Sequence, residues 1–563
     1  MPLLRAKYLK KRDIQPVIKA FFLFFYKNTE GVVVGLQKLE SAIDRVTSSH
    51  PVNSALKYFT HFLHKKHHSS RNLCIFTTFR SLSIKNVLIM LIGREKEQAI
   101  LQRALRSQES EMVAVIGRRR VGKTYLIHSV YADKIRFETS GVQNASLKEQ
   151  LNNFNFQLKK AFGDIAPEAS PKTWQDAFFS LITCWEANPS VHQNILFFDE
   201  LPWLASKKSG FLNALSFFWN TWAVKKNVIV VICGSAASWM IQKVVNDKGG
   251  LHNRITKRLD LQPFTLGETE AFLKLRQVNL ERYQILQIYM AMGGIPHYLN
   301  EVVNGRSAIQ NIEDICFAKS GILYNEFNRL YPALFDNAEH HIAIIRALSQ
   351  KRSGMSRLDI LEATELPDGG GTSTCLEELE SSGFISTYPS FEKKKKELIY
   401  RLTDEYSLFY LKFIENNQTQ SADTWQHLSQ TQSFKSWCGY AFESICLKHI
   451  AQIKKALGIS GIYAEASTFY QKGQAAQQGV QIDLILDRND NTINLFEIKF
   501  YAEPYILTKS QADTFRTKRA LFKHYSQTRK QVFLSLISTY GLVENEQSIG
   551  LIDNTIALDA LFD

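Results

Sequence analysis

The sequence has few cysteines, and their spacing does not suggest a covalent or metal-bound framework. Only seven occur in 563 residues, and no two of them form a CxxC pair. An odd number of cysteines without such pairs argues against a disulfide framework and against a zinc site. The chain is therefore not a small disulfide-stapled protein, and a reducing cytosol suits it best.

Long apolar runs are missing as well. The stretch Ala20 to Tyr26 is too short to span a bilayer. No convincing small-residue cleavage site follows Phe25, as an export signal would require. We therefore expect a cytoplasmic protein with no membrane partner.

Positive charge is concentrated at the start of the chain. The formal net charge is +14, of which residues 1–89 contribute +11 and residues 90–563 only +3. The total charge is thus weak support for nucleic-acid binding by the rest of the chain. Because Met90 stands directly before Leu91-Ile92-Gly93, we hypothesise that the natural product starts there and excludes the basic leader, residues 1–89.

One octapeptide carries the strongest functional signal. The run Gly117 to Thr124 reads GRRRVGKT and follows an apolar stretch that ends at Ile116. In the pattern GxxxxGK[ST], the glycines (Gly117, Gly122) let backbone N–H groups surround an anion. Lys123 reaches the terminal phosphates, and the hydroxyl of Thr124 binds Mg²⁺. The sequence therefore predicts a strand, a phosphate-binding loop and a helix that together bind ATP and Mg²⁺.

Two further strand ends supply polar groups for the same site. The run Ile195 to Phe198 is typical of a buried strand and ends in Asp199-Glu200. Asp199 can hold the Mg²⁺ shell, while Glu200 can polarise an attacking water. A third run, Asn227 to Cys233, leads to Ser235, which either senses the terminal phosphate or caps the next turn.

The order of elements predicts an α/β P-loop NTPase core with a parallel sheet and helices on both faces, followed by four further parts. Helices at Thr269 to Arg276 and Ile285 to Met292 suggest a helical lid. The predicted divisions are the leader (1–89), the ATPase core (90–265), the lid (266–335), a winged helix (336–405), a connector (406–430) and a C-terminal α/β domain (431–563).

The predicted winged helix has a helix near His340 to Ser349, a second capped by Ser356, and a third capped by Thr372 that stops at Gly383. Strands near 384–391 and 398–402 flank a turn of four lysines, 393–396. The third helix offers three glutamates and no Lys or Arg, so it would repel phosphate. We therefore favour protein contact or mechanical coupling over DNA reading for this part.

Two acidic strands stand out in the last 130 residues. If Arg488 to Thr492 forms the hairpin loop, a register symmetric about Asp490 pairs Asp483 with Glu497. Alternation places Lys499 on the same face as Glu497. Facing carboxylates require either a divalent cation between them or neutralisation by Lys499, and a cation beside a lysine suits phosphodiester hydrolysis.

Taken together, the motifs resemble those of a known family. Gly93-Arg94-Glu95, the phosphate loop, Phe198 to Trp203, Gly234-Ser235-Ala236 and Gly293 to Pro296 resemble the archaeal-type (DEXX-box) ATPases of the AAA+/STAND group. Ala441-Phe442-Glu443, Ile482-Asp483-Leu484 and Phe496 to Lys499 resemble the PD-(D/E)xK nuclease-like domain often fused to them. The resemblance covers residues 90–563 and leaves the leader unmatched.

The resemblance implies a role for each of these residues. It gives Gly122, Lys123 and Thr124 to ATP, Thr124 and Asp199 to Mg²⁺, and the water-activating role to Glu200. Gly93 and Arg94 would lie near the adenine, and Arg254 would stabilise charge or form a structural ion pair. In the C-terminal domain it gives Asp483, Glu497 and Glu443 to metal and Lys499 to the attacking water. Ile482 replaces the usual proline, which leaves activity open.

These observations predict an ATP-dependent switch that acts through a nuclease-like module, with DNA as the expected target. Protein partners are expected at the winged helix, and an oligomer is compatible with this interpretation. The alternative is a regulatory scaffold that binds ATP and uses an inactive C-terminal domain for protein contacts. A small-molecule kinase is less favoured, because kinases have little need of appended domains of this size.

Overall fold

The computed structural model describes residues 91–190, 194–246, 251, 253–335, 337–351, 353–389, 391, 398–417, 423–471 and 479–563. The chain divides into two units, Met1–Met90 and Leu91–Asp563. The basic leader lies outside the described residues, so the hypothesis about Met90 stays a prediction. All that follows concerns the second unit.

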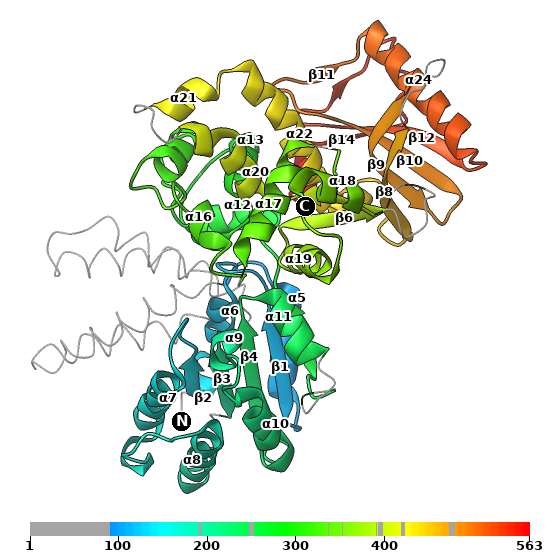
Figure 1. Ribbon diagram of the computed structural model, residues 1–563. Coiled ribbons are helices and arrows are strands. Elements are labelled where there is room, and N and C mark those ends of the chain that lie inside the picture. Colours follow the sequence, from blue (N-terminus) through cyan, green and yellow to red (C-terminus); the bar gives the residue numbers. More distant parts are fainter. Residues whose placement is uncertain are drawn as a thin grey trace, which may run out of the picture. The chain divides into compact units, whose positions relative to one another are not determined.

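A parallel sheet of five strands forms the centre of the first part of this unit (Figure 1). Its order is β2-β3-β4-β1-β5, and every neighbouring pair is parallel. The predicted parallel α/β core is thus confirmed. The strands are β1 (Glu111–Ile116), β2 (Ile135–Ser140), β3 (Ile195–Asp199), β4 (Ile229–Gly234) and β5 (Lys257–Asp260).

Both faces of this sheet are buried, because successive side chains of each strand point into different cores. Val113 and Val115 of β1 pack in one apolar cluster, while Met112, Ala114 and Ile116 pack in another. The helices of this part are α5 (Glu95–Arg106), α6 (Lys123–Tyr131), α7 (Leu147–Phe162), α8 (Trp174–Ala187), α9 (Leu201–Leu204), α10 (Phe211–Thr221) and α11 (Ala237–Met240). The short elements are η2 (Ala132–Lys134), η3 (Gly163–Ile165), η4 (Ala223–Lys225) and η5 (Ile241–Val245).

A helical segment follows the first sheet, in line with the two helices that the sequence predicts. Its elements are α12 (Leu266–Leu275), α13 (Arg282–Met292), α14 (Pro296–Leu299), α15 (Ala308–Ile312), η6 (Glu313–Phe317) and α16 (Phe327–Leu330). Gly293 ends α13 with a φ of 66°, and Pro296 begins α14. A left-handed glycine after one helix and a proline at the start of the next separate the two helices.

Three helices and an antiparallel hairpin come next, at the residues where the winged helix was predicted. They are α17 (Ala338–Gln350), α18 (Arg357–Thr364), α19 (Gly370–Ser381), β6 (Ile385–Pro389) and β7 (Leu398–Leu402). Ser356 caps α18 as expected. The expected cap at Thr372 is wrong: α19 starts two residues earlier, and the Thr372 hydroxyl donates to the carbonyl of Pro367. The four lysines 393–396 lie outside the described residues.

A connector of short helices leads to the last part. It contains α20 (Glu405–Phe409), η7 (Tyr410–Ile414), η8 (Glu415–Asn417) and α21 (Thr424–Leu428). Its aromatic side chains pack together: Trp425 stacks on Phe317 and meets the edges of Phe409 and Phe413. Aromatic pairs in such geometries stabilise a small core beyond their buried area.

The C-terminal part is a mixed five-stranded sheet with the order β14-β12-β10-β9-β8. The pairs β8–β9 and β9–β10 are antiparallel, while β10–β12 and β12–β14 are parallel. The strands are β8 (Ala464–Gln471), β9 (Val480–Arg488), β10 (Thr492–Lys499), β12 (Gln531–Ser538) and β14 (Asn554–Ala557), with a small separate pair β11 (Tyr505–Ile506) and β13 (Leu542–Val543).

Two helices precede this sheet, and a long helix connects its central strands. The preceding helices are α22 (Gln432–Lys448) and α23 (Ile450–Ala456). Helix α24 (Lys509–Ser526) links β10 to the parallel strand β12 and runs along the sheet in Figure 1, and η9 (Leu558–Leu561) closes the chain. Among the described helices, none is long and apolar enough to cross a membrane.

Candidate functional site

The predicted phosphate loop connects the end of β1 to the start of α6. A Cβ atom on Gly117 would lie 2.5 Å from the carbonyl oxygen of Leu261, so only glycine fits there. Gly122 has a φ of 90°, a conformation that glycine adopts at little cost. Lys123 is buried, and its Nζ donates to the carbonyl oxygens of Gly117 at 2.8 Å and Arg118 at 3.0 Å. The loop therefore closes around its own lysine.

The polar residues predicted at neighbouring strand ends lie together beside this loop. The hydroxyl of Thr124 donates to Asp199 Oδ2 at 2.7 Å. Glu200 Oε2 accepts from the hydroxyl of Ser235 at 2.8 Å and from its N–H at 3.2 Å. Glu200 has a left-handed backbone with a φ of 47°, a strained conformation that is often found at functional sites. The residues predicted for magnesium and for water thus share one edge of the sheet.

Gly93 and Arg94 also lie close to the phosphate loop. The backbone N–H of Arg94 donates to Glu268 Oε1 at 3.3 Å, and its Nη2 donates to the carbonyl of Val121 at 3.5 Å. Burial lowers the pKa of the Arg94 guanidinium, which also packs over the ring of Phe264 at 4.8 Å. This segment therefore connects the loop to the start of α12.

Arg254 lies away from the other predicted site residues, and its charge-stabilising role stays a prediction. It is exposed and lies just before β5, where the neighbouring Thr256 N–H donates to Met112 at the start of β1. The phosphate loop follows the opposite end of β1, about six residues or ~20 Å along the strand. Parallel pairing of β1 and β5 keeps Arg254 at the far edge of the sheet.

Arg118, inside the loop, makes a contact that the sequence did not suggest. Its guanidinium is 3% exposed and forms an ion pair with Asp404, which is 2% exposed. It also lies over the ring of Phe384 at 4.6 Å, and the backbone N–H of Asp404 donates to the Phe384 carbonyl. Although burial opposes ionisation of Asp404, the charge of Arg118 keeps its pKa below the usual value. The loop is thus tied to the segment that follows β7.

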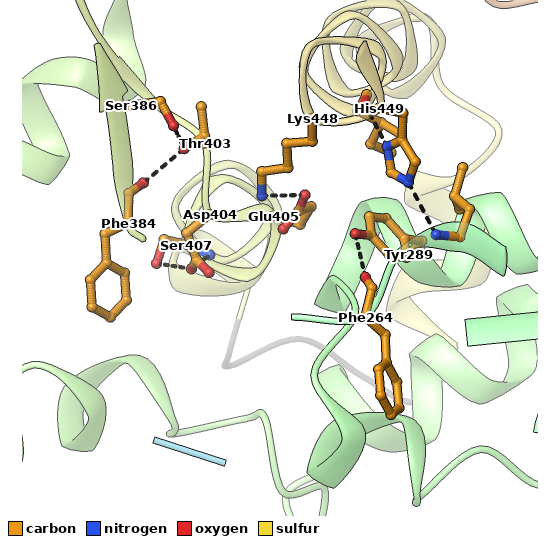
Figure 2. Close-up of polar contacts among 12 residues, drawn as sticks. Phe264, Tyr289, Phe384, Ser386, Thr403, Asp404, Glu405, Ser407, Lys448 and His449 are labelled. Atoms are coloured by element: carbon orange, nitrogen blue, oxygen red, sulfur yellow. Dashed lines mark hydrogen bonds and ion pairs between the residues drawn. The ribbon is translucent and has the colours of Figure 1, made fainter. Parts of the chain in front are cut away.

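The next residue continues the connection toward the C-terminal part, as Figure 2 shows. Glu405 Oε1 accepts from Lys448 Nζ at 2.6 Å, at the end of α22. A Cβ atom on Gly293 would lie 2.8 Å from Glu405 Oε2, so this glycine leaves room for the carboxylate. Asp404 and Glu405 therefore reach the phosphate loop and α22 from adjacent positions.

A second junction joins α22 to the start of α12 (Figure 2). His449 Nε2 accepts from the backbone N–H of Leu266 at 3.1 Å, and its Nδ1 lies 2.8 Å from the carbonyl of Ile445. Burial lowers the pKa of His449 to about 4, so the ring is neutral at physiological pH. A neutral ring can donate from Nδ1 and accept at Nε2, as both contacts require.

The predicted register of the acidic hairpin is confirmed. Strands β9 and β10 pair from Ile493 with Asp487 to Phe496 with Leu484, and one further step places Glu497 opposite Asp483. Glu497 and Lys499 share a face, with 3.4 Å between Glu497 Oε2 and Lys499 Nζ. The other face, with Phe496 and Ile498, packs in the core.

The remaining predicted residue, Glu443 on α22, lies close enough to Asp483 and Glu497 for their charges to affect its pKa. Burial, and then the negative charge of Asp483, raises the pKa of Glu443 to about 8. Asp483 accepts a hydrogen bond from Gln481 at 2.8 Å. Lys518 of α24, which the sequence did not single out, donates to the other oxygen of Glu497. Among the described residues, however, no three His, Cys, Asp or Glu side chains are grouped closely enough to hold a metal ion.

Comparison with known proteins identifies the first part of the chain. Residues 91–302 match the family described as an ATPase domain predominantly from Archaea. These residues form an archaeal-type ATPase domain. The match supports ATP hydrolysis and implies a nucleotide and, usually, Mg²⁺. The archaeal-type ATPase domain includes the loop, Asp199, Glu200 and Ser235, and it ends before the three helices and the hairpin.

Three archaeal proteins illustrate what the chain is similar to. An uncharacterized protein of Methanocaldococcus jannaschii is 21% identical over 418 residues, which cover 73% of this chain and 88% of that protein. A Walker-type ATPase of Pyrococcus abyssi is 15% identical, with 57% of this chain and 96% of that chain covered and a TM-score of 0.39. The ORC2 protein of Aeropyrum pernix is 16% identical, with coverage of 61% and 96% and a TM-score of 0.35.

Proposed function

We propose that this chain is a nucleotide-driven switch, in which Mg²⁺-ATP in the archaeal-type ATPase domain controls the C-terminal α/β domain. In this proposal Lys123 binds the terminal phosphates, Thr124 and Asp199 hold magnesium, and Glu200 orients the attacking water. Bound magnesium would neutralise charge on the phosphates. The hydrogen bond between Thr124 and Asp199 supports this assignment, because both oxygen ligands already face each other.

The two roles of Arg118 carry the proposal. Its carbonyl accepts from Lys123, while its guanidinium pairs with Asp404. To reach a phosphate, Lys123 must leave that carbonyl. The bound nucleotide would also bring its negatively charged phosphates close to the Arg118 guanidinium, which pairs with the Asp404 carboxylate. Nucleotide binding therefore alters the residue that anchors the segment 384–405.

That segment has contacts on both sides. Phe384 and Asp404 touch Arg118, whereas Phe391 packs against Phe469 of β8 and Phe522 of α24. Together with Glu405 and Lys448, these contacts support a route from the loop to the C-terminal sheet. We infer that residues 336–405 form a winged helix that works as a mechanical relay.

We further infer that the C-terminal domain is nuclease-like and that its target is DNA. Three features support this inference: the mixed sheet with one helix crossing between β10 and β12, the register that sets Glu497 opposite Asp483, and Glu443 near both. Helix α24 beside them is basic, with Lys509, Arg516, Lys518, Arg519 and Lys523 against Asp513 alone. Clustered basic residues favour contact with a phosphate backbone.

A second candidate function is a regulatory scaffold whose C-terminal domain does not cut DNA. The observation that favours it is the pairing of Glu497 with two lysines in place of a metal. In this case the domain would serve protein contacts, and the ATPase domain would still drive the switch.

Hydrogen–deuterium exchange on the full chain tests the switch. We expect a non-hydrolysable ATP analogue with Mg²⁺ to change exchange in the phosphate loop, in α20 and in α22. Lys123→Ala should abolish all three changes, because it removes the phosphate ligand. Lys148→Ala, an exposed lysine on α7, is the matched control and should behave like wild type.

Arg118→Met should separate nucleotide binding from its effect on the C-terminal part. We expect this variant to keep the nucleotide-dependent change in exchange at the phosphate loop and to lose the change at α22. A wild-type response at α22 in this variant would refute the relay. Cleavage of DNA with Mg²⁺, lost in Asp483→Ala with an unchanged ATPase rate, would support the nuclease over the scaffold.

A further inference from the structure

The contacts of Glu497 differ from those of a carboxylate that holds a metal. Glu497 is 4% exposed, and each of its two oxygens faces an ammonium group. Lys518 Nζ donates to Oε1, and Lys499 Nζ lies 3.4 Å from Oε2. A carboxylate that binds a divalent cation needs a free oxygen lone pair directed at the metal. Here each oxygen already has a lysine ammonium group beside it, where a cation would approach.

The charges around Glu497 are already balanced without a metal. Asp483 and Glu497 contribute two negative charges, and Lys499 and Lys518 contribute two positive ones. A divalent cation entering this arrangement would leave excess positive charge beside a buried carboxylate, which is unfavourable.

We propose that Lys518 is the residue that excludes divalent cations from this site, with its ammonium group in the position that a cation would take on Glu497. The proposal rests on the nuclease-like interpretation of the C-terminal domain and adds a means of control to it. Metal uptake then requires Lys518 to leave Glu497. Lys499 comes from the same strand as Glu497, whereas Lys518 comes from α24 and its side chain can turn away from the strand.

The surroundings of Lys518 allow such a movement. Lys518 and Asp483 line the same hollow of about 890 Å³, between the start of β9 and one side of α24. The side chain of Lys518 is 28% exposed, so its far end already borders solvent. Ser510, Thr514 and Thr517 of α24 also line the hollow and offer hydroxyl groups to a displaced ammonium. A long lysine side chain can move into such a space without unfolding the helix.

A titration with MnCl₂ and no nucleotide tests the proposal on the full chain. We expect Lys518→Met to gain a Mn²⁺ site that is tighter than any in this domain of the wild type by about tenfold or more. Lys523→Met is the matched control, because it removes the same charge from an exposed position on the same helix. It should bind Mn²⁺ as wild type does. Adding Asp483→Asn to Lys518→Met should remove the new site.

Thermal unfolding without metal shows whether each variant is folded, and Lys518→Gln replaces Lys518→Met if the latter is not. Folded variants that bind Mn²⁺ no better than wild type would overturn the proposal, as would a new site that survives Asp483→Asn. This test is independent of the test of the nucleotide switch. The switch is tested by hydrogen–deuterium exchange with an ATP analogue, whereas the Mn²⁺ titration contains no nucleotide.

Discussion

The buried ion pair between Arg118 and Asp404 leads to a prediction whose size follows from its surroundings. Asp404→Ala leaves the Arg118 guanidinium buried without a counter-charge. Its Nε and Nη2 atoms have no hydrogen-bond partner among the described residues. Removing one partner of a buried pair costs about 3–5 kcal/mol. Asp404 also caps α20 through the N–H of Ser407, and losing a cap adds about 1 kcal/mol.

Arg118→Met should cost less, because Asp404 keeps other partners. Its Oδ2 accepts from the N–H of Ser407 at 2.9 Å and from the hydroxyl at 2.6 Å. A carboxylate that retains these bonds is only partly uncompensated, so we expect a cost of about 2 kcal/mol. The double variant Arg118→Met/Asp404→Ala should be more stable than the sum of the two losses predicts, by more than about 1 kcal/mol.

Native-state hydrogen exchange on peptides that cover the phosphate loop and α20 measures these local free energies of opening. Asp368→Asn provides the control, since it breaks an ion pair with Arg357 in which Asp368 is 67% exposed. Such a surface pair contributes about 0–1 kcal/mol. If Asp404→Ala cost no more than Asp368→Asn, or if the two losses simply added, the pair would not connect the loop to α20 energetically.

Three further predictions concern single groups. Between the unfolded pKa of a glutamate, about 4.3, and the folded pKa of Glu443, about 8, the folded state binds more protons, so stability falls as pH rises. Between pH 5 and 8.5 the melting temperature of Glu443→Gln should therefore rise relative to that of wild type as the pH increases. Melting temperatures that change in parallel with pH would contradict this. His449→Phe removes the acceptor for the Leu266 N–H and should lower stability by about 1–3 kcal/mol, whereas an unchanged melting temperature would show that the bond contributes nothing. Ser235→Ala should slow ATP turnover more than it weakens ATP binding, because it removes the hydroxyl that donates to Glu200; equal effects on both would refute a role for this hydroxyl in positioning that carboxylate.

Local pattern was enough to predict the nucleotide site and the acidic hairpin. The phosphate loop follows a fixed spacing, and parallel pairing necessarily brings the ends of β1, β3 and β4 to one edge. The register between Asp483 and Glu497 follows from the centre of a short turn, which the sequence shows directly. Each of these predictions depends on residues close in sequence or on a regular repeat.

The contacts that the sequence did not show all join distant segments. Arg118 occupies a variable position of the loop pattern, and its partner Asp404 lies 286 residues away. Lys518 is one of several basic residues on α24, and only the packing of the helix selects it. The position of Arg254 could not be predicted, because it depends on the pairing of β5 with β1. No local periodicity encodes these choices.

The energies of two ion pairs, Glu405–Lys448 and Arg118–Asp404, indicate which of them can act as the switch. Moving a two-state equilibrium from 1:99 to 99:1 needs a difference of about 5.5 kcal/mol between the states. The pair of Glu405 with Lys448, which is 25% exposed, can supply only a modest part of this, since partial exposure screens the charges. The Arg118–Asp404 pair is buried on both sides, and leaving one of its charges without a partner costs about 3–5 kcal/mol, which is most of this difference. Loss of this pair should therefore uncouple the C-terminal domain from ATP, whereas loss of Glu405–Lys448 should only weaken the response.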